Sequence, residues 1–248
     1  MDFRFRFITA IAALFLLCPR ADAQSVRPVD LELLLAVDVS SSVDREEYDL
    51  QMRGLSEAFR HPAVQDAVLA AGHLGIAVAV VQWSDSNDQS LVIDWTVIHD
   101  AASTEALAER IGNTERVVSG SQTAISGALA FSLQQLTTNR FEGRRQVIDV
   151  SGDGRANSGD HPMALRDLAV ANGVIINGLA ILNEEPFVDS YYRYTVIGGD
   201  GAFLMTAHDY EDFAVAILEK LIREIDLPPV SGRPPIGPVL ADRGQGRR

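Results

Sequence analysis

Three polar segments of this sequence carry the side chains best suited to chemistry. The first is a D-x-S-x-S segment, Asp38, Ser40 and Ser42, directly after an apolar stretch that begins at Leu31. One carboxylate and two hydroxyls in a single turn are hard oxygen donors, which suit Mg²⁺ or Ca²⁺ better than zinc or copper. Aspartate and serine also cap helices, so this segment taken alone fits a capping turn equally well.

Two later segments add donors of the same kind. Thr123 precedes a helical pattern that begins near Ile125, and Asp153 follows the apolar stretch 146–150. In open α/β sheets, ligands bind at the carboxyl ends of the parallel strands. If these strands are neighbours, five side chains converge at one sheet edge and predict a site for one divalent cation. The predicted ligands are Asp38, Ser40, Ser42, Thr123 and Asp153.

Three further aspartates lie near these segments. Asp149 interrupts the strand before Asp153, where it is either an outer-shell acceptor or a competitor for the metal. Gly154 fits the turn after Asp153 and favours Asp153 as the ligand. Asp85 and Asp88 belong to a polar turn, which is either simply solvated or a rim that a partner contacts.

The elements that must position these residues alternate along the chain. Alternating strands and helices predict an α/β fold with a mostly parallel sheet and helices on both faces. The polar turn 84–89 makes strand 90–95 an antiparallel edge strand. Asp44 and Glu47 form the pattern of a capping box at the start of a helix. The strands are expected at 31–39, 76–83, 90–95, 146–150, 174–181 and 202–205, and the other helices at 104–111, from Ile125, at 162–172 and from Asp209.

Composition excludes several classes of function. The formal net charge is −13, from 34 acidic and 21 basic residues, which argues against a nucleic-acid partner. Lys220 is the only lysine, so a P-loop or a Schiff-base mechanism has almost no place in the chain. There is also no G-x-S-x-G elbow for a serine hydrolase.

The first 23 residues have the pattern of a secretory signal peptide. Arg4 and Arg6 precede an apolar run, 7–18, and an A-x-A site predicts cleavage after Ala23. The run is shorter than the roughly 20 residues that a bilayer needs, and we expect no membrane span in the mature chain. Cleavage removes Cys18, the only cysteine, so we expect a thiol-free protein in a bacterial periplasm or outside the cell.

The predicted mature chain divides into one domain, 24–226, and a tail, 227–248. The tail is rich in proline, glycine and arginine, a composition typical of disordered segments.

The five-residue pattern resembles the von Willebrand factor A-type domain with its metal-ion-dependent adhesion site. That pattern is D-x-S-x-S, a later threonine, and an aspartate in a T-D-G-like turn. The resemblance covers about 29–226, and the segment 78–84 is similar to the family's second strand. The segment 196–203 is similar to a subgroup of secreted bacterial proteins with only an uncharacterised-domain label. Gly152 departs from the pattern, because the family usually has threonine there.

The resemblance implies a six-stranded, Rossmann-like, doubly wound sheet with a Mg²⁺, Mn²⁺ or Ca²⁺ ion at its edge. It implies direct ligation by Ser40, Ser42 and Thr123, and ligation through water by Asp38 and Asp153. One coordination position then stays open for an acidic residue of a protein partner.

The function predicted from these observations is therefore a secreted, metal-dependent binding module rather than an enzyme. One alternative is a metal-dependent hydrolase or phosphoesterase that uses Asp38 and Asp153. Against it, the sequence offers no evident general base beside the site. The other alternative is a structural domain whose metal site is degenerate.

Overall fold

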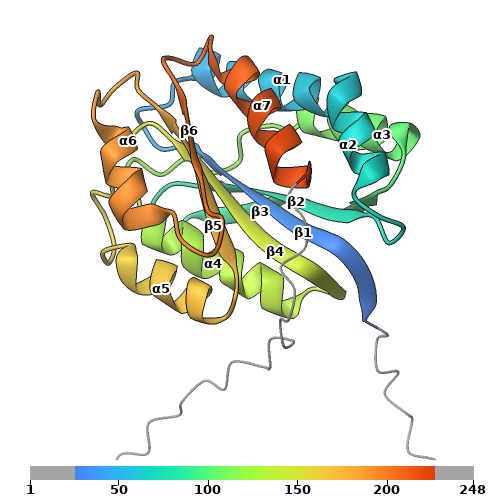
Figure 1. Cartoon of the computed structure of the whole chain (residues 1–248). Helices are drawn as coiled ribbons and strands as arrows, with labels where there is room; N and C mark the ends of the chain where they lie inside the picture. The colour runs from blue at the N-terminus through green and yellow to red at the C-terminus, as the bar shows by residue number, and fades with distance from the viewer. Residues whose placement is uncertain (1–25, 227–248) are drawn as a thin grey trace, which may run out of the picture.

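A computed structural model describes residues 26–226 of the chain. The predicted signal peptide, its cleavage after Ala23 and the predicted tail 227–248 lie outside the described residues. The described chain forms a six-stranded sheet in the order β3-β2-β1-β4-β5-β6 (Figure 1). The strands are β1 (Arg27–Asp38), β2 (Ile76–Trp83), β3 (Gln89–Ile98), β4 (Phe141–Gly152), β5 (Ile175–Ile181) and β6 (Leu204–Ala207).

All neighbouring strands are parallel except β2 and β3, which are antiparallel. This confirms the predicted sheet and its single antiparallel edge strand. Because β1 lies between β2 and β4, the order of the strands reverses there. The carboxyl ends of β1 and β4 are therefore neighbours, and a crevice for a ligand is expected at this point of such a sheet.

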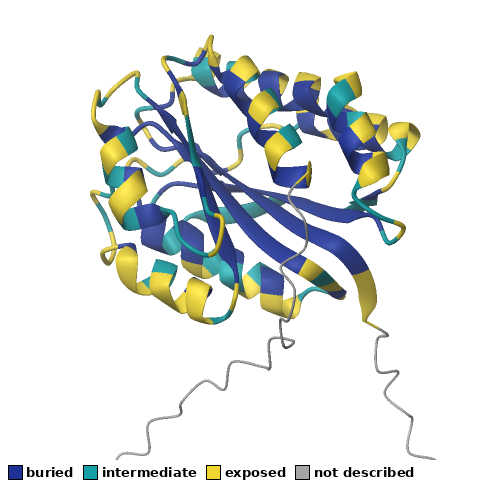
Figure 2. Ribbon diagram, in the orientation of Figure 1, coloured by how far each residue is buried: buried dark blue, intermediate teal, exposed yellow. Residues whose placement is uncertain are grey.

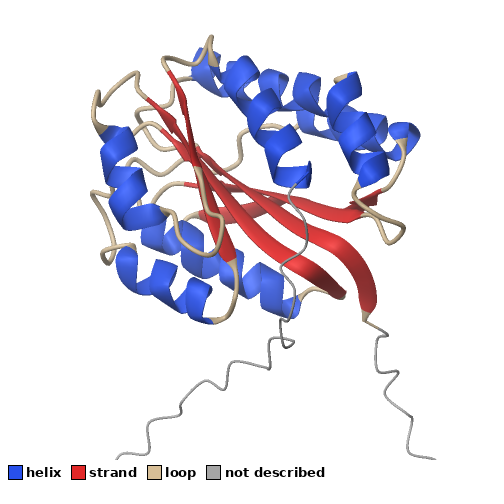
Figure 3. Cartoon of the chain, in the orientation of Figure 1, coloured by secondary structure: helices blue, strands red, loops and turns tan. Residues whose placement is uncertain are grey.

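Helices cover both faces of the sheet (Figures 1 and 3). One face carries α1, α2, α3 and α7, and the other carries α4, α5 and α6 with the π-helical turn η1. The helices are α1 (Arg45–Arg60), α2 (Pro62–Ala70), α3 (Ala101–Gly112), α4 (Ile125–Thr138), α5 (Met163–Ala171), α6 (Val188–Tyr191), η1 (Tyr192–Val196) and α7 (Phe213–Asp226).

The central strands are apolar because both of their faces are covered. In β1, Leu33 and Leu35 pack under α1 and α7, whereas Leu34 and Ala36 pack toward α4. Figure 2 shows the middle of the sheet as one continuous buried layer between exposed outer helix surfaces. This rigid layer fixes the positions of the loops at its edges.

Hydrogen bonds of nearby aspartates set where α1 and α7 begin. The predicted capping box at α1 is present, because the Asp44 carboxylate accepts from the Glu47 amide and Glu47 accepts from the Asp44 amide. The last helix begins at Phe213 instead of Asp209, because the Asp209 carboxylate accepts from the amides of Glu211 and Asp212 in a preceding turn. Within residues 26–226, no helix has the length and apolar character that crossing a bilayer requires.

Candidate functional site

The loop after β1 is held in one conformation by its own backbone and by Arg116. The Ser40 amide donates to Asp38 Oδ1 at 2.8 Å, and the Val43 amide donates to the Ser40 carbonyl. The guanidinium of Arg116 donates to the carbonyls of Val39, Ser40 and Val43. This arrangement fixes where the side chains of Ser40 and Ser42 lie.

The five predicted ligands come together at the carboxyl ends of β1 and β4. Ser42 Oγ donates to Asp153 Oδ1 at 2.8 Å and lies 3.2 Å from Ser40 Oγ. Thr123 Oγ1 donates to Ser40 Oγ at 3.3 Å. With the Ser40–Asp38 bond, these contacts link all five residues from three separate loops.

Asp85 and Asp88 hold the loop that carries Thr123. Asp88 Oδ2 accepts from the amides of Ser119 and Gly120, and Asp85 Oδ1 accepts from the Gln122 amide. The structure thus places both carboxylates beside the site, where they bind backbone of the same polypeptide.

Asn157 fixes Thr123 from the other side of the loop. Asn157 Oδ1 accepts from the Thr123 amide at 2.8 Å, and the Asn157 amide donates to the Thr123 carbonyl. These two hydrogen bonds fix the backbone of Thr123, and with it the position of the threonine hydroxyl, in the absence of an ion.

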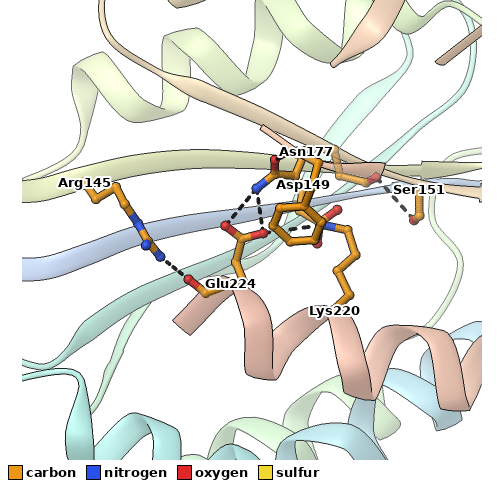
Figure 4. Close-up of polar contacts among 8 residues, drawn as sticks. Arg145, Asp149, Ser151, Asn177, Lys220 and Glu224 are labelled. Atoms are coloured by element: carbon orange, nitrogen blue, oxygen red, sulfur yellow. Dashed lines mark hydrogen bonds and ion pairs between the residues drawn. The ribbon is translucent and has the colours of Figure 1, made fainter. Parts of the chain in front are cut away.

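Asp149 lies in a different cluster, between the sheet and α7 (Figure 4). Its Oδ2 is 2.8 Å from Lys220 Nζ, and Lys220 also pairs with Glu224 one helical turn away. Asn177, the cross-strand neighbour of Asp149 on β5, donates to both carboxylate oxygens of Glu224. Asp149 therefore forms its ion pair with α7, away from the five candidate ligands.

The electrostatics of the site favour a positive charge. Asp38 is fully buried, and its Oδ2 makes no hydrogen bond within residues 26–226. Burial, and secondly the nearby charge of Asp153, raises the pKa of Asp38 to about 8. Burial also raises the pKa of Asp153, against the hydrogen bonds from Ser42 and Tyr210. A bound cation relieves both effects, because it neutralises the paired carboxylates.

The donor set fits a hard divalent cation. It offers three neutral hydroxyls and two carboxylates, and the described residues contain no cluster of three His, Cys, Asp or Glu side chains that could ligate an ion without hydroxyls. Oxygen donors of this kind suit Mg²⁺, which retains several waters in protein sites. The partnerless Oδ2 of Asp38 is an acceptor that a hydrated ion or its water can use.

Two tyrosines that the sequence did not indicate also reach the site. Tyr210, in the loop after β6, donates from Oη to Asp153 Oδ2 at 3.0 Å. Tyr192, in η1, is fully buried against Gly152 and Asp38. Neither tyrosine lies in a short sequence motif with the aspartates, and each reaches them only through the folding of the chain. Arg116 was missed for the same reason.

The chain belongs to a family described as "Protein of unknown function (DUF1194)", whose model matches residues 28–228. A search of curated proteins finds no match to the sequence.

Solved structures with a similar fold are von Willebrand factor A-type domains. The von Willebrand domain of the type V pili tip protein Mfa5 from Porphyromonas gingivalis superposes with a TM-score of 0.57 at 13% identity, over 83% of this chain and 98% of that chain. Proximal thread matrix protein 1 from the mussel byssus, in a structure with a zinc-occupied MIDAS motif, gives 0.56 at 16% identity, over 80% of this chain. The chain spans about half of that protein, 47%.

A third similar structure is the manganese-loaded TRAP protein of Plasmodium vivax. It gives a TM-score of 0.52 at 15% identity, over 79% of this chain and 73% of that chain. At these identities the comparisons establish the fold, which is that of a von Willebrand factor A-type domain.

Proposed function

We propose that the protein is a von Willebrand factor A-type binding module that holds one divalent cation and binds a carboxylate of a protein partner. Ser40, Ser42 and Thr123 supply hydroxyl ligands, and Asp38 and Asp153 hold the ion through water. Mg²⁺ is the proposed ion, and Mn²⁺ or Ca²⁺ fits the same oxygen donors.

The observation that carries this proposal is the set of contacts that joins five oxygen-bearing side chains from three loops. Neutral hydroxyls in direct contact leave more of the ion's charge uncompensated than carboxylates do. The ion therefore stays attractive to an incoming carboxylate, which the acidic chain repels at long range. The zinc-occupied mussel protein and the manganese-loaded parasite protein support a divalent ion in this fold.

The contacts of the two aspartates favour binding over hydrolysis. Asp153 accepts from Ser42 and Tyr210, and Asp38 accepts from the Ser40 amide. Both carboxyls are also fully buried, whereas a general base needs a carboxylate or imidazole that faces a substrate. With the predicted signal peptide, we propose that the module works in the periplasm or outside the cell.

The test is a calorimetric titration of Mn²⁺ and Mg²⁺ into residues 24–248. We expect one ion per chain, and we expect Asp38→Ala and Asp153→Ala to abolish binding. Asp66→Ala is the matched control, because Asp66 is exposed on α2 at a distance from the loops of the site. A folded protein that binds neither ion contradicts the proposal and leaves the degenerate structural domain. For the partner, we expect capture from the extracellular fraction that EDTA reverses and that the Asp153 variant lacks.

A further inference from the structure

The phenol oxygen of Tyr192 is buried without a hydrogen-bond partner in the described chain. The residue is fully buried among the apolar side chains under α6 and β5, and Oη makes no hydrogen bond within residues 26–226. It lies in η1, a π-helical turn. Such turns are rare in proteins, and those that do occur often lie at functional sites. Phenylalanine would fill the same volume without burying a hydroxyl, so the hydroxyl calls for an explanation.

Gly152 shows what the hydroxyl faces. A Cβ at this position would lie 2.5 Å from Tyr192 Oη and 2.8 Å from Asp38 Oδ2. The hydroxyl and the carboxylate oxygen therefore flank one point directly above Gly152, the residue before Asp153. Both atoms are buried, and neither makes a hydrogen bond in the described chain, with the other or with any third group. One is an obligatory acceptor when ionised, and the other is a donor.

The second aspartate of the site already has the corresponding contact. Tyr210 Oη donates to Asp153 Oδ2 at 3.0 Å, on the carboxylate oxygen that Ser42 does not use. The Tyr192 hydroxyl is a donor of the same kind.

We propose that Tyr192 is a positioning residue for the cation site: when the ion is bound, its hydroxyl donates to Asp38 Oδ2 and fixes the orientation of that carboxylate toward the ion. This rests on the proposed function and extends it to a residue outside the predicted ligand set. Tyr192 and Tyr210 then form a pair of buried donors, one for each aspartate. Gly152 is required because any side chain there occupies the space in which the hydroxyl and the carboxylate meet.

The role proposed for Tyr192 also accounts for Gly152, which stands where the von Willebrand factor A-type family usually has threonine. In this chain the hydroxyl beside Asp38 comes from Tyr192, and a side chain at 152 has no room. The two residues are therefore expected to be coupled, and changing one alters what the other can do.

The experiment compares the parent with Tyr192→Phe in two measurements on residues 24–248. Calorimetry gives the Mn²⁺ affinity, and thermal unfolding in EDTA gives the stability without metal. We expect Mn²⁺ affinity to fall about tenfold, as when other partners of metal-binding groups are removed. We expect the unfolding midpoint in EDTA to stay equal or to rise, because the variant no longer buries a hydroxyl without a partner. If Tyr192 had only a structural role, Tyr192→Phe would leave the Mn²⁺ affinity unchanged and would lower the unfolding midpoint in EDTA.

Two further variants sharpen the test. Tyr191→Phe is the matched control, since its ring lies against Tyr192 with centroids 6.4 Å apart, and we expect both measurements to equal the parent. Gly152→Ala should weaken Mn²⁺ binding at least as much as Tyr192→Phe, because its Cβ separates the two oxygens. Equal Mn²⁺ affinity in the parent and Tyr192→Phe overturns the role of Tyr192 and leaves the proposed function intact. A parent that does not bind Mn²⁺ overturns both.

Discussion

Asp38 shows how burial prepares a residue for a cation. Its carboxyl is fully buried, with a pKa raised to about 8 by burial and by Asp153. At neutral pH and without metal, this group keeps its proton. In the proposed site, a divalent cation would have to displace that proton, so metal binding would be coupled to proton release.

This coupling predicts a pH dependence of metal binding. We expect Mn²⁺ affinity to increase from pH 6 to pH 8 and to level off above the pKa of Asp38, because the competing proton is then lost. Calorimetry in two buffers of different ionisation enthalpy measures the protons released. We expect release at pH 7 and much less at pH 9. An affinity that is the same at pH 6 and pH 8 contradicts this expectation.

The last helix, α7, is joined to the sheet by a buried charge cluster as well as by apolar packing. Lys220 is fully buried, 2.8 Å from Asp149 Oδ2, with its Nζ 4.7 Å from the centre of the Phe203 ring. Arg145 donates to the backbone carbonyl of Glu224 (Figure 4). A helix attached in this way cannot slide along the sheet without separating buried charges, which is costly in a low-dielectric interior.

The cluster predicts a large effect from a single substitution. Lys220→Met keeps most of the side-chain volume but leaves the carboxylates of Asp149 and Glu224 buried without their ammonium partner. We expect a loss of about 3–5 kcal/mol in the free energy of unfolding, measured by urea denaturation. Arg223→Met is the control on the same helix, because Arg223 is exposed and its guanidinium lies over Phe203. A difference below about 1 kcal/mol between the two variants contradicts a stabilising role for the cluster.

The strands and most helices could be predicted because their signals are local. Both faces of β1, β2 and β5 are covered, so those strands contain long apolar runs, whereas β4 is apolar mainly over 147–150, where Asp149 interrupts it. The helix α2 was missed, although His61 caps it and Pro62 begins it, because it has only 9 residues and follows α1 after the single extended residue His61. The five candidate ligands could be singled out in the sequence because their order along the chain is itself a motif.

The partners of these residues could not be predicted from the sequence. Asp149 was considered as a competitor of Asp153 for the metal, whereas its contacts in the structure are with Lys220 on α7. Tyr192 and Tyr210 lie far along the chain from the aspartates that they approach. Such pairings depend on how helices pack on the sheet, and no spacing within the sequence encodes them.

For the whole molecule, the buried carboxyls make folding stability depend on pH in an unusual direction. Asp38, Asp149 and Asp153 all have raised pKa values, with burial as the largest cause. A carboxyl with a raised pKa in the folded state contributes stability that is complete below its unfolded value. That stability is lost as pH rises through the folded value.

We therefore expect the protein in EDTA to lose stability between about pH 4 and about pH 8, the range set by the ordinary and raised pKa values of Asp38. Mg²⁺ should restore the loss at pH 8. Asp38→Asn keeps the shape of the side chain without its titration, so the unfolding midpoint of this variant should vary less with pH. Thermal unfolding from pH 5 to pH 9, with and without Mg²⁺, measures this. Parallel curves for the parent and the variant contradict the assignment to Asp38.

Both ends of the described domain lie on the side of the sheet from which β1 and β4 begin. Arg27, at the start of β1, pairs with Phe141 at the start of β4, and the last turn of α7 is bonded to Arg145 on the same strand. The loops with the five oxygen-bearing residues lie at the opposite edge, where β1 and β4 end (Figure 1). The loops of the proposed cation site therefore lie at the end of the sheet away from both ends of the described domain, where another protein surface can reach them.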